Sequence, residues 1–150
     1  MAKFDDLAPT LMGKLMTDFE LSDVQAAGIL GNLGHESAGF TAFHESGQPE
    51  GRGGYGWAQW TGPRRRTFFA WCDERGLDRE SDAASEGFLW HELKNTERAT
   101  IPALRTATSL SDAVRIFQEK FERAGIINYA GRQKWAERAL TAFNRSLGIA

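Results

Sequence analysis

Apolar residues recur along this chain at spacings of three and four, which is the pattern of amphipathic helices. Five segments show it, with these residues on the apolar face: Leu11, Met12, Leu15, Met16 and Phe19; Phe68, Phe69 and Cys72; Phe88, Leu89 and Leu93; Leu110, Val114, Phe117 and Phe121; Ala136, Ala139, Leu140, Phe143 and Leu147. The pattern predicts a chain that is helical almost throughout. No apolar stretch reaches the length of a membrane-spanning helix, so we expect no transmembrane segment.

Capping residues mark where some helices begin and end. Ser22 followed by Gln25 matches a capping box, which predicts a sixth helix running toward Glu36. The sequence at 61–63 is Thr-Gly-Pro, and it predicts a helix start because proline is favoured in a first helical turn. Gly76 predicts the end of that helix.

Residues 47–60, GQPEGRGGYGWAQW, break the helical pattern with five glycines and a proline. Glycine at this density permits positive φ and close backbone approach, which predicts a short β-hairpin or an ordered loop. An irregular segment of this length inside a compact domain is more often functional than idle. We therefore predict an all-α to α+β fold, one domain over residues 1–150, with this segment beside a cleft.

Composition adds limits of its own. The 150 residues are 41% hydrophobic and 25% charged, which is typical of a globular domain with one core. Cys72 is the only cysteine, and its apolar neighbours predict a buried thiol in a reducing compartment. The first residues lack the apolar core of a signal peptide, so we expect synthesis in the cytoplasm without an export signal.

Charge is uneven, although the net charge is only −2. Residues 1–50 contain two Lys against eight Asp and Glu, a net −6, and residues 120–150 contain six Lys and Arg against two Glu, a net +4. We expect the cations of the last helix either to be merely solvated or to face an anionic surface; they are Arg132, Lys134, Arg138 and Arg145. No nucleic-acid-binding motif accompanies them, so we expect no nucleic-acid partner.

The stretch GHESAGFTAFHES, residues 34–46, repeats His-Glu-Ser after nine residues. Glu36 would lie at the negative end of its helix dipole, which disfavours a carboxylate, whereas Glu45 would lie in a wetter setting. Two carboxyl groups in contrasting environments are what glycoside hydrolysis uses. From spacing alone, two solvated surface glutamates are the more common case.

The same stretch offers potential metal ligands. His35, His44 and His91 each precede a glutamate. None has the spacing that turns two histidines to one helix face, and no second cysteine is present. We expect no metal site.

Three stretches in order resemble the phage tail lysozyme family of the lysozyme-like superfamily: GNLGHESAGF, GGYGWAQWTGPRRR and FERAGIINYAGRQKWAERAL. The resemblance spans Leu11 to Ala142 and implies a lysozyme-like helical domain. In the wider superfamily a Glu-Ser pair at a helix end carries the catalytic acid, and Glu36-Ser37 matches it. A glycine-led motif that closes with Gln lines the cleft there, and residues 56–59 are similar.

Many phage endolysins of the lysozyme type have an Asp nine residues after the catalytic Glu and a Thr six residues further on. Glu45 occupies the Asp position here, but Gly51 occupies the Thr position, so that part of the pattern fails. The resemblance thus implies Glu36 as the general acid. Glu45 is the candidate second carboxylate, and Glu50 is a lesser candidate for the same task.

Aromatic and amide side chains near the glycine-rich segment are candidates for substrate binding. Flat rings can stack on sugar faces or simply fill the core, and both alternatives are open for the three rings. An amide suits an N-acetyl group or a catalytic water. The substrate-binding candidates are Ser37, Tyr55, Trp57, Gln59 and Trp60.

The resemblance implies a muramidase that cleaves the β-1,4 bond between N-acetylmuramic acid and N-acetylglucosamine in peptidoglycan, without metal or organic cofactor. Two alternatives are open: a lytic transglycosylase giving 1,6-anhydro products, and a non-catalytic phage tail or wall-binding module. The implied partner is the peptidoglycan glycan strand. We expect a monomer made in the host cytoplasm that acts on the wall in the periplasm, either free or as part of a virion.

Overall fold

The computed structural model describes residues 2–149, and most of them are helical. The helices are α1 (Lys3–Phe19), α2 (Asp23–Ser37), α3 (Gly62–Arg75), α4 (Asp82–Lys94), α5 (Thr100–Leu104), α6 (Leu110–Phe117), the short π-helix η1 (Gln118–Glu122) and α7 (Tyr129–Ser146). All six predicted helices are present, which confirms the helical fold class. Helix α5 was not predicted, because its five residues are too few for a periodic pattern. Among the described residues, no helix combines the length and apolarity that crossing a membrane requires.

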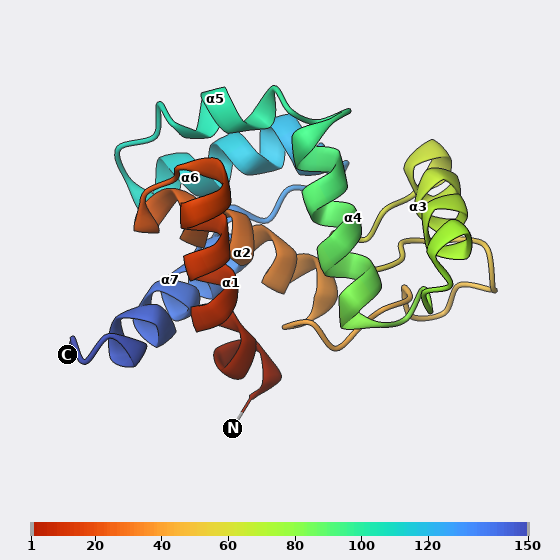
Figure 1. Cartoon of the computed structure of the whole chain (residues 1–150), viewed down its shortest axis with the longest axis horizontal. Helices are drawn as coiled ribbons and strands as arrows, with labels where there is room; N and C mark the ends of the chain where they lie inside the picture. The colour runs from red at the N-terminus through yellow and green to blue at the C-terminus, as the bar shows by residue number, and fades with distance from the viewer. Residues whose placement is uncertain (1, 150) are drawn as a thin grey trace.

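Helix α2 is the central element, in contact with α1, α6 and α7. A Cβ at Gly28 would lie 2.5 Å from the Cβ of Ala113 on α6, and a Cβ at Gly31 would lie 2.5 Å from that of Ala136 on α7. These spacings are too short for a larger side chain, so glycine permits the close packing. Figure 1 shows α3 and the glycine-rich segment on the opposite side of α4 from α1 and α7.

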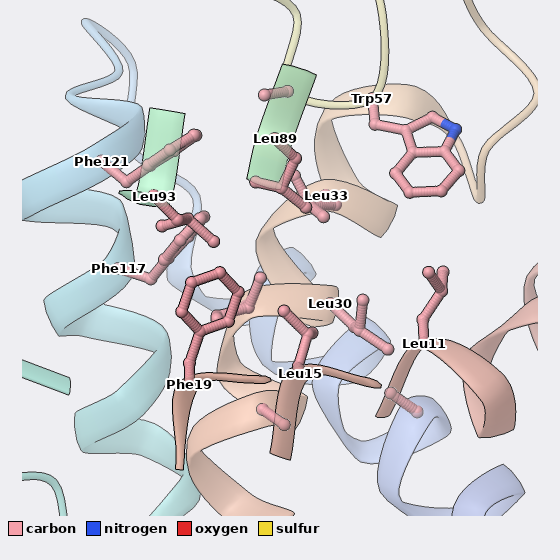
Figure 2. Close-up of a cluster of buried hydrophobic side chains, with 14 of the residues drawn as sticks. Leu11, Leu15, Phe19, Leu30, Leu33, Trp57, Leu89, Leu93, Phe117 and Phe121 are labelled. Carbon is pink, nitrogen blue, oxygen red and sulfur yellow. The ribbon is translucent and has the colours of Figure 1, made fainter. Parts of the chain in front are cut away.

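The predicted apolar stripes meet in a core. Figure 2 shows side chains that converge from α1, α2, α4, α6 and η1: Leu11, Leu15, Phe19, Leu30, Leu33, Leu89, Leu93, Phe117 and Phe121. Burial of each such side chain contributes about 1.5–3 kcal/mol. The core therefore confirms the interpretation of the apolar spacing, and it supports the C-terminal end of α2. Leu147 is the exception: it follows the last residue of α7 and is exposed, so its assignment to the apolar face is wrong.

Helix boundaries follow the predicted caps. The Ser22 hydroxyl accepts a hydrogen bond from the Gln25 backbone N–H at 3.3 Å, and the Gln25 side chain accepts one from the Ser22 N–H at 3.0 Å. Gly76 ends α3 with a left-handed φ of 65°. Cys72 is a buried free thiol, as predicted, and burial raises the pKa of this thiol to about 11.

The glycine-rich segment is an ordered loop rather than a regular hairpin. Two isolated β-bridges join His44 to Tyr55 and Tyr55 to Trp60. The Glu45 N–H also donates to the Gly54 carbonyl at 2.9 Å. At Gly56, φ is 77°, and a Cβ there would lie 2.6 Å from the Trp60 ring. This loop brings its own residues to the end of α2.

Candidate active site

A cleft of about 390 Å³ opens where the end of α2, the glycine-rich loop and the end of η1 meet. It is lined by Glu36, Glu45, Ala58, Gln59, Thr61, Glu122, Arg123, Ala124 and Gly125. Three of the side chains selected from the sequence, Glu36, Glu45 and Gln59, are therefore brought together. The lining also includes Glu122, which was not selected.

The end of α2 positions Glu36. Ser37 is the last residue of the helix, and the next three residues all have positive φ, which turns the chain sharply. The buried Ser37 hydroxyl donates to the Leu33 carbonyl at 2.7 Å and accepts from the Phe40 N–H at 2.8 Å. Both bonds stabilise the turn, so in this structure Ser37 shapes the site without lining the cleft.

A buried arginine holds the Glu36 carboxylate. Arg132 of α7 has a side chain only 1% exposed, and its Nη2 donates to Glu36 Oε2 at 2.6 Å. Its Nη1 donates to the Asn32 side-chain oxygen at 3.0 Å. The Asn32 amide in turn donates to the carbonyls of Gly28 and Val114. A network across α2, α6 and α7 therefore fixes one face of Glu36.

The expectation that Arg132 belongs to an exposed cationic surface is wrong. Gly31 lets α7 lie so close to α2 that a Cβ there would be 2.6 Å from the Arg132 carbonyl oxygen. The guanidinium is therefore enclosed, and Glu36 supplies the charge that its burial requires. The first turn of α7 carries this residue into the site, while Lys134, Arg138 and Arg145 line a separate groove.

The neighbouring histidine adds no charge to this pair. Burial lowers the pKa of His35, and the Arg132 charge lowers it further, which outweighs the opposite effect of Glu36. His35 is therefore neutral near neutral pH. Within residues 2–149, no group of three or more His, Cys, Asp and Glu side chains lies close enough to hold a metal ion.

Glu122, the last residue of η1, brings another carboxyl group to the cleft. Its Oε2 is buried and has no hydrogen-bond partner in the described structure. Burial raises the pKa of Glu122 well above its ordinary value, and the Glu36 charge raises it further. Arg132 and Arg64 oppose this rise. Short π-helical turns often occur at functional sites.

Sequence reasoning missed Glu122 for a definable reason. It is one of twelve glutamates, and it directly follows Phe121, the last residue of an apolar stripe. A regular helix would have continued past it, so spacing gave no sign of a cleft. The stretch FERAG, quoted for the family resemblance, was the available signal.

Glu45 has a wetter setting than Glu36, as predicted. It is exposed at the rim of the cleft. Its Oε1 accepts from the Gly54 N–H at 3.2 Å, and its Oε2 accepts from the Gln48 amide at 3.2 Å. Glu50, the lesser candidate, lines a different pocket together with Tyr55.

The Gln59 amide lines the cleft but also holds the loop. Its Nε2 donates to the carbonyls of Ala42 at 3.0 Å and Gly56 at 2.9 Å. Its backbone is left-handed, with a φ of 53°. The amide nitrogen is therefore occupied by the loop itself.

The three aromatic candidates are core residues in this structure. Tyr55, Trp57 and Trp60 are each no more than 3% exposed. The indole N–H of Trp57 donates to Asp82, and that of Trp60 donates to Glu92. None of the three rings offers a free face to a sugar, which agrees with the alternative that they fill the core.

Comparison with known families gives one match. A family model described as phage tail lysozyme matches residues 7–143. That span includes the whole cleft described above, with Glu36, Glu45, Glu122 and Arg132. No curated protein matches the chain.

Proposed function

Because the chain belongs to the phage tail lysozyme family, we propose that it cleaves the β-1,4 bond between N-acetylmuramic acid and N-acetylglucosamine in peptidoglycan. The observation that carries this proposal is the position of Glu36, which is held by Arg132 and lines a polar cleft together with Glu45.

In the proposed reaction Glu36 is the general acid. Its proton passes to the glycosidic oxygen as the bond from that oxygen to the anomeric carbon breaks. A water adds its hydroxyl group to the anomeric carbon, and Glu45 orients this water and accepts its proton. We propose Gln59, through its side-chain oxygen, as a contact for the substrate or for this water.

One observation favours a second candidate function. Both carboxylate oxygens of Glu45 already accept hydrogen bonds within the loop, which restrains the group proposed to orient water. A lytic transglycosylase needs no such group, because the hydroxyl at C6 of the sugar attacks its own anomeric carbon. The product is then a 1,6-anhydro sugar.

Mass spectrometry of fragments released from purified peptidoglycan tests these candidates. Hydrolysis gives reducing ends, and the transglycosylase reaction gives anhydro ends lighter by one water. Reducing N-acetylmuramic acid ends are expected. Anhydro ends would select the transglycosylase, and release of no fragments would leave the non-catalytic wall-binding module as the function.

We further propose that the protein acts as a monomer on the glycan strand. The proposed setting is synthesis in the host cytoplasm and action on the wall in the periplasm, free or within a virion. Sedimentation of the purified protein together with purified wall tests the binding part of this proposal.

A further inference from the structure

Two carboxyl groups in the cleft lie within the influence of Arg132, but only one of them is bound to it. Glu36 accepts a hydrogen bond from Arg132 at 2.6 Å. Glu122 lines the same cleft and is influenced by Arg132 only through its charge. Its buried Oε2 has no hydrogen-bond partner among the described residues. A carboxylate whose buried oxygen has no donor is costly, and a protonated carboxyl avoids most of that cost.

The charges around Glu122 lead to the same conclusion. Four groups from four other helices act on it: Glu36 of α2, Arg132 of α7, Arg64 of α3 and Glu92 of α4. They form two ion pairs, Arg132 with Glu36 and Arg64 with Glu92. Each of these cations is thus already matched by another carboxylate. Arg123, the neighbouring cation of the cleft lining, pairs with Glu97 at 2.6 Å, so none of these three cations of the described structure is left without a carboxylate partner.

We propose that Glu122 is a positioning residue that holds one proton in the cleft and supplies it to Glu36. This inference rests on the proposed function. The proton passes from the Glu122 carboxyl to the Glu36 carboxylate and then to the glycosidic oxygen as the bond to the anomeric carbon breaks. The attacking water adds its hydroxyl group to that carbon, and its proton returns to the pair through Glu45. The pair therefore ends each turnover with the one proton it began with.

The pH dependence of wall cleavage tests this role in Glu122→Gln, which keeps the side-chain shape. The alkaline limb is the part of the pH–rate profile in which activity falls as pH rises. In the wild-type protein it then reports loss of the last proton shared by Glu36 and Glu122. With Gln at 122 the only remaining proton is that of Glu36, so the alkaline limb should move to lower pH by about one unit or more. Activity above neutral pH should fall about tenfold or more, and acidic buffer should restore most of it.

Glu92→Gln is the matched control, because Glu92 is also a buried carboxylate paired with an arginine. It lies outside the cleft lining, and its effect on Glu122 is the smallest among the four groups named above. Its alkaline limb should stay at the wild-type pH. An unchanged alkaline limb in Glu122→Gln, with wild-type cleavage intact, would overturn the inference and leave the proposed function standing.

Two further measurements do not depend on activity. A ¹³C carboxyl titration of the wild-type protein should show one glutamate that titrates well above about 4.3 and whose signal is missing from Glu122→Gln. The same buried acid lowers wild-type stability as pH rises, because the native state then holds a proton that the unfolded state has lost. The unfolding equilibrium constant of wild type relative to Glu122→Gln should therefore rise about tenfold per pH unit through this range.

If the Gln variant does not fold, Glu122→Asp keeps the acid and should keep the alkaline limb. A wild-type protein that cleaves no wall would refute the proposed function, and with it the relay. Absence of the high titration in the wild-type protein would overturn the inference by itself.

Discussion

Two Glu–Arg pairs in this molecule have the same closest distance and opposite exposure. Glu36 and Arg132 approach to 2.6 Å with the cation 1% exposed and the carboxylate 19% exposed. Glu92 and Arg64 also approach to 2.6 Å, but here the carboxylate is 3% exposed and the cation 21%. Of these two pairs, the one at the cleft has the carboxylate as its accessible partner, and the other has the cation.

Hydrogen bonding separates the pairs further. Glu92 accepts two bonds from Arg64 and one from the Trp60 indole, and Arg64 also donates to the Phe121 carbonyl. Within residues 2–149, Arg132 is the only side-chain donor found for Glu36. The Arg64–Glu92 pair ties α3 and α4 to the core, whereas the Arg132–Glu36 pair leaves a carboxylate oxygen without a side-chain partner among the described residues, as a group that takes up and donates a proton requires. The exposed partner and the free lone pairs, rather than the ion pair itself, distinguish a reactive carboxylate from a structural one.

Removing the buried cation should have the largest combined effect. Arg132→Met leaves Glu36 without its counter-charge and Asn32 without its donor. Loss of one partner from a buried pair costs about 3–5 kcal/mol of unfolding free energy. Wall cleavage should fall at least about 100-fold, because Glu36 is no longer oriented. Urea unfolding and a turbidity assay measure both quantities, and a stable, active variant would show that the network does not position Glu36.

A change in the Arg64–Glu92 pair should lower stability without lowering activity. Glu92→Gln should lower the unfolding free energy by about 3 kcal/mol, since Arg64 is left partly buried without a counter-charge. Because the altered atoms lie outside the cleft, activity of the folded variant should stay within about threefold of wild type, a change of less than about 1 kcal/mol in activation free energy. A loss of activity with unchanged stability in Glu92→Gln would contradict the distinction between a reactive Glu36–Arg132 pair and a structural Glu92–Arg64 pair.

The sequence revealed the helices because their signals are local. Apolar spacing and the Ser22–Gln25 capping box depend on neighbours within a few residues, and those predictions are confirmed. The partner of Glu36 is different in kind: Arg132 lies 96 positions away along the chain. No periodicity marks such a contact, so a residue that sequence placed on a cationic surface is in fact buried.

The cleft was predictable only in part. Glu36, Glu45 and Gln59 were selected through the family resemblance and share one cleft, although their catalytic and binding roles stay predictions. The burial of Trp57 and Trp60 depends on how the loop folds over α4, which composition cannot reveal. Glu122 was hidden because a π-helical turn changes which face a side chain occupies.

Glu45 gives a smaller and more diagnostic effect. Under the hydrolase proposal, Glu45→Gln should lose about tenfold or more of its activity, because an amide cannot accept the proton of the attacking water. Its fold should be unaffected, since the group is exposed at the rim. Nearly normal activity together with anhydro products would show that the protein is a lytic transglycosylase instead.

The exposed cations of α7 should matter least. Arg138 already pairs with Asp5 at 2.9 Å. If the remaining cations face an anionic surface, the alternative left open by the sequence, attraction to the wall falls mainly to Lys134 and Arg145. The double change Lys134→Gln and Arg145→Gln should weaken binding to whole wall about twofold at low salt. Added salt should remove the difference, because screening acts over about 8 Å at physiological ionic strength. Equal losses on a short soluble oligosaccharide would argue against surface attraction.

The most direct test compares Glu36→Gln with Glu92→Gln on purified peptidoglycan, at one pH and with matched circular dichroism spectra. General acid catalysis contributes about two to four orders of magnitude, so Glu36→Gln should lose at least about 100-fold of its clearing rate while Glu92→Gln remains close to wild type. A folded Glu36→Gln variant that keeps more than about a tenth of the wild-type rate would fall outside that range and would contradict the assignment of Glu36 as the acid.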